Sequence, residues 1–220
     1  MTKPYGDPEK ARVLVVGHDP RLQSSDTAAE YAFFADYFFR TAPRSGPEKR
    51  KYGLAASVFH MVASLTCGRV EPDEVLLTNL CNQSLPHAPK RKTVLIPETA
   101  ARVGVSQIAG LVSNSTIKVV LAMSQQVNYW LRALEYCDAD PIFVKEAKPK
   151  QVGVDHAPPY YEPQKPKAFL RVCGQALESP GEFVVVPVLH VKQWPLNPRM
   201  SAYEPCVSLA ERNVSQLLIS

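Results

Sequence analysis

The sequence lacks several features that would assign the protein to a class at once. Its five cysteines are scattered and form no C-x-x-C pair, which argues against a disulfide framework and gives no support for a structural zinc or iron–sulfur site. We therefore expect free thiols in a reducing compartment. The sequence shows no signal peptide, no apolar run of membrane-spanning length and no internal repeat. These absences predict a soluble, intracellular protein.

The composition is that of an ordinary globular domain. Apolar residues make up 45% of the 220 residues and charged residues 21%, so one domain over residues 1–220 with a sizeable core is expected. The net charge of +4 is compatible with a polyanionic partner but does not require one. Residues 1–11 read as a polar arm, and residues 145–167 as a long, basic, proline-rich loop.

Short apolar runs alternate with stretches of helical periodicity along the chain. The runs predict strands over 12–17, 75–79, 117–123, 142–144 and 183–189. Helical periodicity predicts helices over 54–66, 97–112, 124–136, 168–178 and 205–218, with another after the capping-box pattern Thr27-x-x-Glu30. This alternation predicts a three-layer α/β/α fold with a central, mostly parallel sheet of four or five strands.

Polar side chains follow four of the expected strands. Asp19 follows the first strand through the turn Gly17-His18-Asp19-Pro20, and Asn79, Ser124 and His190 end or follow three later strands. In an open α/β sheet, ligands bind at the edge formed by the carboxyl ends of the strands. The sequence therefore predicts that these side chains converge on one edge.

Four short motifs around these residues resemble the uracil-DNA glycosylase superfamily. GHDP at 17–20 resembles the water-activating GQDP motif, and VLLTN at 75–79 resembles the strand that carries the base-reading asparagine. IKVVLAMSQQ at 117–126 resembles the next strand-to-helix segment, and VLH at 188–190 resembles the catalytic-histidine motif. The resemblance runs in order over residues 12–197 and implies the fold of that superfamily.

The resemblance implies a monofunctional enzyme of base excision repair that flips a damaged base out of DNA and hydrolyses its N-glycosidic bond. Asp19 would orient the attacking water, and a neutral His190 would stabilise the negative charge that develops on the base. Asn79 would read the base edge, and Phe33 or Phe34 would stack on the flipped base. Such a mechanism needs no metal or other cofactor. The resemblance further places in the substrate pocket Gly17, His18, Pro20 and Ser124.

The chain departs from that family at positions that concern the substrate. His18 stands where the family has glutamine, and Arg21 where it has the tyrosine that blocks the thymine methyl group. Uracil or a related damaged base is therefore the expected substrate class. The segment after His190 also differs; its expected nucleic-acid contacts are Lys192, Gln193, Trp194 and Leu196. Lys192 could bind phosphate, and Trp194 or Leu196 could act as a wedge in DNA.

Other interpretations of the same residues remain open. Asp19 and Asn79 could serve only turns, Ser124 could be only a helix N-cap, and the phenylalanines could belong to the core. The basic segments 44–51, 90–92 and 145–167 could be solvated loops or DNA contacts. The expected partner is single- or double-stranded DNA with a damaged base, bound by a monomer and away from membranes. The alternatives are a non-catalytic nucleic-acid- or nucleotide-binding module and a nucleoside hydrolase-like enzyme.

Overall fold

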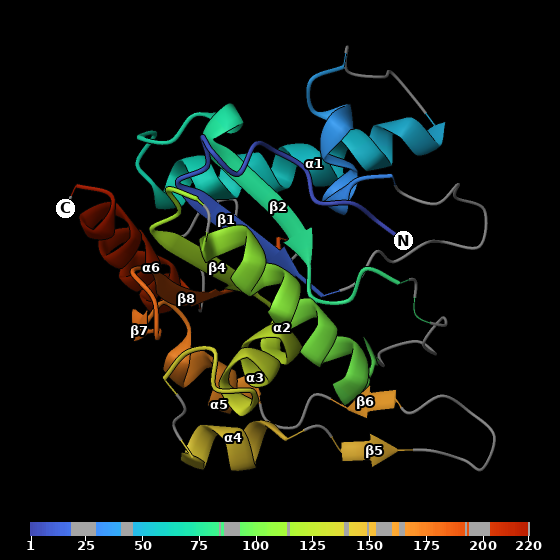
Figure 1. Cartoon of the computed structure of the whole chain (residues 1–220), viewed down its shortest axis with the longest axis vertical. Helices are drawn as coiled ribbons and strands as arrows, with labels where there is room; N and C mark the ends of the chain where they lie inside the picture. The colour runs from blue at the N-terminus through green and yellow to red at the C-terminus, as the bar shows by residue number, and fades with distance from the viewer. Residues whose placement is uncertain are drawn as a thin grey trace.

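Parallel strands form the centre of the sheet in the computed structural model (Figure 1). It describes residues 1–18, 30–40, 46–83, 85, 93–113, 115–138, 141–148, 150–152, 160–162, 166–191, 193 and 203–219. The five-stranded sheet has the order β2-β1-β4-β8-β7. Its parallel members are β1 (Val13–Gly17), β2 (Val75–Asn79), β4 (Val119–Met123) and β8 (Val184–Val188), and the short β7 (Leu177–Glu178) pairs antiparallel with β8.

Helices cover both faces of this sheet, which makes the fold a three-layer α/β/α arrangement (Figure 1). One face is covered by the 3₁₀ helix η1 (Ala32–Tyr37), α1 (Gly46–Leu65) and α6 (Glu204–Leu217). The other is covered by α2 (Glu98–Ser113), α3 (Gln125–Ala133), α4 (Pro141–Ala147) and α5 (Pro166–Val172). A short 3₁₀ turn, η2 (Pro72–Glu74), leads into β2. None of the helices described is long and apolar enough to cross a membrane.

The strands read as continuous apolar runs because both of their faces are buried. In β1, Val13 and Val15 belong to the core on the α1 side, whereas Leu14 and Val16 belong to the core on the α2 side. All four side chains are completely buried. Burial on both faces is typical of parallel strands between helix layers, and it explains why these runs were recognisable in the sequence.

The N-terminal arm binds along the outer edge of β2. Tyr5 exchanges both backbone hydrogen bonds with Leu77, at 2.9 and 2.8 Å, and Lys3 forms a bridge with Tyr31. An exposed strand edge invites pairing with other chains, and the arm covers part of this one. The arm also connects the edge of β2 to the segment that enters η1.

A second, three-stranded sheet lies at the periphery with the order β3-β6-β5 (Figure 1). It consists of β3 (Thr93–Val94), β6 (Tyr160–Glu162) and β5 (Lys150–Val152), all paired antiparallel. The sequence interpretation of 145–167 as a loop is therefore wrong for these two strands. Their short apolar content carries no period that sequence analysis could detect.

Three other expectations were wrong. The helix expected over 168–178 ends at Val172, and Leu177–Glu178 forms the strand β7 through its pairing with β8. The strand expected at 142–144 is part of α4, because three apolar residues are too few to distinguish strand from helix and Pro141 occupies the first helical position. The basic segment 44–51 was expected to be a loop, but α1 begins within it, at Gly46. Here Gly46-Pro47 followed by Glu48 is the usual beginning of a helix.

Gly104 of α2 packs against Leu80, the residue after β2, and so tests how closely this helix approaches the sheet. A Cβ added to Gly104 would collide with the backbone carbonyl of Leu80, whereas one added to Gly110 of the same helix meets nothing within 4 Å. We expect Gly104→Ala to lower the free energy of unfolding by about 2 kcal/mol or more. Gly110→Ala is the matched control and should raise it by roughly 0.5–1 kcal/mol. Urea denaturation of both variants measures the difference, and equal stabilities would show that α2 does not approach residue 80 this closely.

Candidate functional site

The parallel pairing brings the carboxyl ends of the central strands to one edge of the sheet. Gly17 is in register with Asn79, and Met123 is in register with Val188. The backbone N–H of Ser124 donates to the carbonyl of Val188 at 3.4 Å. The structure therefore places Asn79, Ser124 and the first residues after β1 and β8, His18 and Leu189, at the same edge. Asp19, which the sequence also predicts there, lies outside the described residues.

Gly17, Phe33 and Asn79 are in direct contact at this edge. A Cβ added to Gly17 would collide with Cζ of Phe33 and lie 2.7 Å from Oδ1 of Asn79. Only glycine can occupy this position without moving the ring or the amide. Residues of β1, η1 and β2 thus meet at the end of β1, where the Phe33 ring and the Asn79 amide lie side by side.

The amide of Asn79 is buried and incompletely satisfied. Asn79 is 3% exposed, and its Nδ2 has no hydrogen-bond partner among the residues described. A buried donor without a partner costs about 1–3 kcal/mol, so native proteins rarely retain one without a reason. The donor lies at the ligand-binding edge of an α/β sheet. A ligand carbonyl at this edge would satisfy it.

The backbone of Phe33 and Phe34 is left-handed, with φ of 57° and 55°. This conformation costs roughly 1–2 kcal/mol per residue for residues other than glycine. The segment that contains these phenylalanines therefore does not form the regular helix that the sequence predicts after Thr27-x-x-Glu30. Residue 27 itself lies outside the described residues. The chain is held in place on both sides of the pair by Ala32 and Ala35, which are completely buried.

The left-handed backbone directs the two phenylalanine rings to different surroundings. The Phe33 ring lies against Gly17. The Phe34 ring packs edge-on against Tyr37, with centroids 6.2 Å apart, and the Lys51 ammonium of α1 lies 5.3 Å from its centroid. The sequence left open which phenylalanine would reach the site. The structure places Phe33 there and Phe34 beside α1.

The residues beside β1 and β4 are positioned by backbone hydrogen bonds and a cap. His18 is 9% exposed, and its carbonyl accepts the N–H of Cys81 at 3.0 Å. Ser124 has φ of 106°, and its side chain caps α3 by accepting the Val127 N–H at 3.4 Å. The N-cap interpretation of Ser124 is confirmed. Asp19 and Pro20 lie outside the described residues.

The end of β8 carries His190 to the same edge. His190 is half-buried, and its carbonyl accepts the Gln193 N–H at 2.7 Å, which closes a turn. Gln193 is exposed. The other expected nucleic-acid contacts, Lys192, Trp194 and Leu196, lie outside the described residues, as does Arg21.

Sequence reasoning missed one residue that touches this strand end. Gly174, which follows α5, donates its backbone N–H to the carbonyl of Pro187 in β8 at 2.7 Å. No motif surrounds Gly174 and it is remote from Pro187 in sequence, so only tertiary structure reveals the contact. Within the described parts of the chain, no three His, Cys, Asp or Glu side chains are grouped so that they could hold a metal ion.

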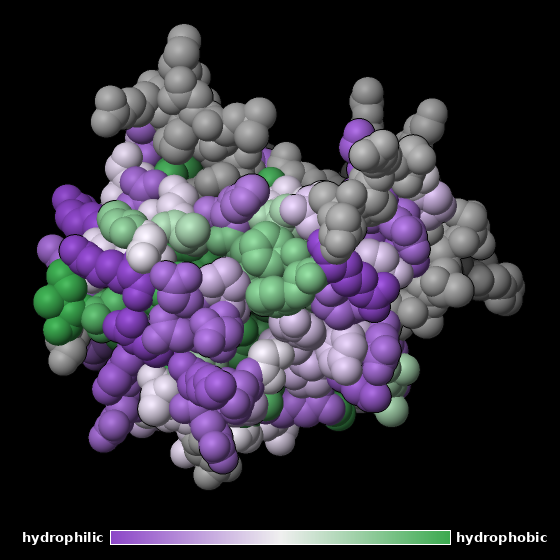
Figure 2. Space-filling model, turned by 90° about the horizontal axis from the view of Figure 1, so that it is seen from above, coloured by the Kyte–Doolittle hydropathy of each residue, from purple (hydrophilic) through white to green (hydrophobic). Residues whose placement is uncertain are grey.

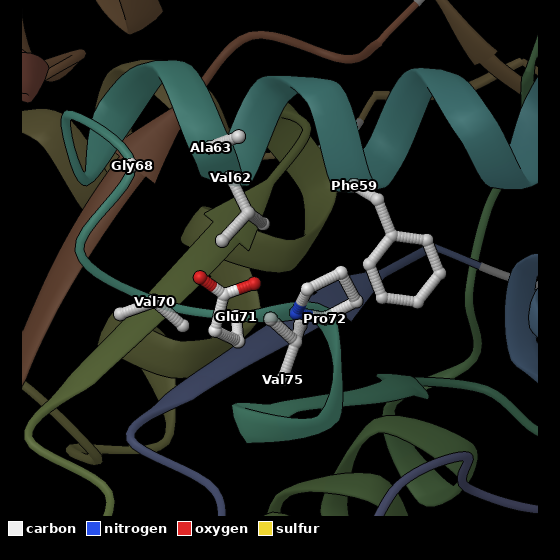
Figure 3. Close-up of a pocket in the computed structure, with 8 residues that line it drawn as sticks. All are labelled: Phe59, Val62, Ala63, Gly68, Val70, Glu71, Pro72 and Val75. Atoms are coloured by element: carbon white, nitrogen blue, oxygen red, sulfur yellow. The ribbon is translucent and has the colours of Figure 1, made fainter.

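A surface cavity of about 240 Å³ lies far from this edge (Figure 3). Its lining comes from α1 and from the start of β2 and the loop before it, namely Phe59, Val62, Ala63, Gly68, Val70, Glu71, Pro72 and Val75. Val75 is the first residue of β2 and Asn79 the last, so the cavity lies at the opposite edge of the sheet. Among the described residues that line it, Glu71 is the one ionisable side chain, and the others are apolar.

The surface seen from above is mainly hydrophilic, with apolar residues in small separate patches (Figure 2). Exposed large apolar side chains of the described regions are scattered over different elements; they are Met1, Phe39, Val103, Ile142 and Ile219. Single exposed apolar residues are ordinary. The carboxyl edge of the sheet, with its unpaired amide and strained aromatic segment, is therefore the candidate functional site.

Replacement of Asn79 tests whether its amide serves the fold or a ligand. We expect Asn79→Leu, which has a similar shape, to raise the free energy of unfolding by about 1 kcal/mol, because it removes an unpaired buried donor. Thr78→Val in the same strand is the control for a buried polar residue. Urea denaturation at neutral pH measures both. A loss of more than about 1 kcal/mol for Asn79→Leu would instead assign the amide a structural role.

Comparisons with known proteins do not identify a family. No protein-family model matches this chain, and a search of curated proteins finds no match. The functional assignment therefore depends on the residues at the carboxyl edge of the sheet.

Proposed function

We propose that this protein is a monofunctional DNA glycosylase of the uracil-DNA glycosylase type, with the fold of that superfamily. It hydrolyses the N-glycosidic bond of uracil or a related damaged base. The observation that carries the proposal is the contact of Gly17, Phe33 and Asn79 at the edge to which β8 also brings His190. The order of the strands and the positions of the motifs on them support it.

Asn79 and Phe33 suit recognition of a flipped base. An amide offers a donor and an acceptor together, which match the donor–acceptor edge of a pyrimidine such as uracil. Nδ2 of Asn79 has no partner among the described residues and would donate to a base carbonyl, while Oδ1 would accept from the ring N–H. Phe33 provides an aromatic face beside this amide. A base removed from the duplex stack regains part of its stacking energy on such a ring.

Asp19 and His190 would perform the hydrolysis. A water oxygen forms the new bond to C1′ of the sugar as the C1′–N bond breaks, and the bonding electrons leave with the base. The proton that the water loses ends on the released base. The Asp19 carboxylate would orient this water and stabilise the positive charge on the sugar. His190 would donate a hydrogen bond to the base oxygen on which negative charge develops. No cofactor takes part in these steps.

A cleavage assay tests the assignment on single- and double-stranded DNA that contains one uracil. We expect Asp19→Asn and His190→Ala each to reduce kcat by about 10²–10³-fold, because each removes stabilisation of the transition state. Asn79→Ala should raise KM and lower kcat, because it removes base contacts. The matched control is Asp73→Asn; Asp73 is exposed in η2 at the opposite edge of the sheet, so this variant should retain full activity.

The same assay distinguishes the alternatives. Equal activity of wild type, Asp19→Asn and His190→Ala would refute the assigned roles. Release of base from free nucleosides, without preference for DNA, would indicate a nucleoside hydrolase. Binding to DNA with no base release from a panel of lesions would indicate a non-catalytic module.

Salt dependence tests the proposed partner separately. We expect binding to uracil-containing single-stranded DNA to weaken linearly with salt on a log–log plot, because phosphate contacts release counterions. Lys192→Ala should reduce the slope by about 0.7 if this lysine contacts one phosphate. Fluorescence anisotropy at several salt concentrations measures the slope. Lys118→Ala, at the opposite edge just before β4, is the control and should leave it unchanged.

A further inference from the structure

The N-terminal arm is bonded both to β2 and to the chain just beyond it. Tyr5 donates its N–H to the Leu77 carbonyl at 2.9 Å and accepts the Leu77 N–H at 2.8 Å. Thr2 is 6% exposed and donates its N–H to the Asn82 carbonyl at 2.9 Å. Asn79, the last residue of β2, lies between these two attachment points in the sequence. The arm is therefore fixed to the strand that carries the amide of the candidate site.

The same stretch of the arm is bonded to the segment that leads into η1. Lys3 donates its N–H to the Glu30 carbonyl at 2.8 Å, and the Lys3 carbonyl accepts the Ala32 N–H at 2.9 Å. Within the described ranges, these are the backbone hydrogen bonds that join residues 30–32 to a distant part of the chain. Ala32 directly precedes Phe33. The arm thus holds the peptide unit from which the chain enters the left-handed turn.

The Tyr5 ring contacts aromatic residues on both sides of η1. It meets the Tyr31 ring edge-on, with centroids 5.4 Å apart, and stacks on the Phe39 ring at 5.9 Å. Tyr31 precedes η1, and Phe39 lies two residues after its end. Aromatic pairs in these geometries stabilise a structure beyond the area that they bury. One side chain of the arm therefore holds both ends of η1.

The turn that presents Phe33 needs support from outside because its backbone is unfavourable. Phe33 and Phe34 are left-handed, and Phe34 donates its N–H to the Tyr31 carbonyl at 3.2 Å, which closes the turn. Such a conformation persists only where the surrounding structure determines it. The buried side chains of Ala32 and Ala35 supply part of this support. The hydrogen bonds and ring contacts of the arm add support on the N-terminal side.

We propose that the N-terminal arm is a positioning element of the candidate site, which sets the place of the Phe33 ring relative to the Asn79 amide. Its positioning residues are Lys3, through its backbone, and Tyr5, through its backbone and its ring. The arm connects β2, which ends at Asn79, to the turn that carries Phe33. Two parts of the site that come from separate elements are thus held in one arrangement by a third segment.

The consequence for a ligand rests on the proposed function. A base that stacks on Phe33 while its edge is bonded to Asn79 requires the ring and the amide to keep a fixed separation. Without the docked arm the ring would take other positions, and base binding would weaken. Stacking is present in the ground state and in the transition state alike, so its loss raises KM with little change in kcat. By linkage, a bound base stabilises the docked arm.

Replacement of Lys3 by proline tests the backbone bond. Residue 3 precedes Pro4, so its backbone is extended, a conformation that proline also adopts. Lys3→Pro removes the N–H that donates to Glu30. Lys3→Ala is the matched control, because it keeps that N–H and removes only an ion pair of 3.5 Å between exposed side chains. The nuclear Overhauser effect between the Phe33 ring and the Gly17 Hα should persist in Lys3→Ala and be lost in Lys3→Pro, while the amide signals of β1 stay unchanged.

A second pair of variants tests the ring of the arm. Tyr5→Ala removes both aromatic contacts and keeps the backbone bonds to Leu77, whereas Tyr5→Phe keeps the ring and is the matched control. We expect Tyr5→Ala, but not Tyr5→Phe, to lose the same Overhauser effect. With uracil-containing single-stranded DNA, Lys3→Pro and Tyr5→Ala should each raise KM roughly tenfold, the scale of one base–aromatic stack. Their kcat should stay within about twofold of wild type, and both controls should keep the wild-type KM.

Hydrogen exchange of the wild-type protein tests the arm without any substitution, so a variant that fails to fold does not block the test. The Tyr5 amide is bonded across the edge of β2, and the Ala32 amide is bonded to Lys3. If undocking of the arm exposes both amides, their protection factors should agree within about threefold. An Ala32 amide protected more than about tenfold better than that of Tyr5 would show that the segment is held without the arm.

The outcomes separate this inference from the proposed function. An unchanged Overhauser effect between Phe33 and Gly17 in folded Lys3→Pro and Tyr5→Ala would overturn the positioning role, whatever the activity. Loss of that effect in variants of a protein that releases no base from DNA would support the positioning role and refute the proposed function. Loss of the effect with an unchanged KM would overturn the influence of the arm on base binding.

Discussion

The parallel pairing of β1 with β2 and β4 determines which side chains can meet in this protein. The central strands begin in register, with Val13 opposite both Val75 and Val119, and each is five residues long. Their carboxyl ends therefore lie level. A slip of one residue would turn every side chain of a strand to its other face, and the apolar cores on both faces oppose that slip. The core thus fixes the position of Asn79 against Gly17.

Structural cost is concentrated at the same edge. The unpaired Nδ2 of Asn79 and the left-handed backbone of Phe33 and Phe34 each cost on the order of 1–3 kcal/mol. Ser124 adds a third departure with its φ of 106°. Such features persist only where the surrounding structure outweighs them. Here the surroundings are the fully buried strands β1, β2 and β4 and the buried alanines of η1, so the edge can keep groups arranged for a ligand rather than for stability.

The strands and their convergence could be predicted from sequence because they depend on local pattern. Buried parallel strands are continuous apolar runs, and Gly17, Ser124 and the glycine-ended helix α1 follow known turn and cap chemistry. Gly68, for example, closes α1 with φ of 69° and donates its N–H to the Ala63 carbonyl. These elements needed no knowledge of contacts between distant residues.

The remaining features could not be predicted because tertiary contacts decide them. The stripe of Tyr31, Phe34 and Phe38 has helical spacing, but contact of Phe33 with Gly17 accompanies a left-handed backbone that interrupts the helix. The two-residue strand β7 exists through its pairing with β8. The close approach of Gly174 to the Cys206 carbonyl requires α5 and α6 to meet. In each case the local sequence is compatible with several structures, and packing selects one.

The differences from the glycosylase motifs that this sequence resembles occur mainly outside the strands, and under the proposed function this distribution has a consequence for specificity. The β2 motif that ends at Asn79 and the β8 motif that ends at His190 retain their residue types, because strands position them through the core. Arg21 and residues 192 and 194–196 lie outside the described residues; in the sequence they come after the segments that form β1 and β8. If the reaction is glycosidic hydrolysis, the chemistry is then carried by the sheet and the choice of base by the loops. Under the proposed function, such a protein could change its lesion while it keeps its mechanism, so the motif residues alone do not define the substrate.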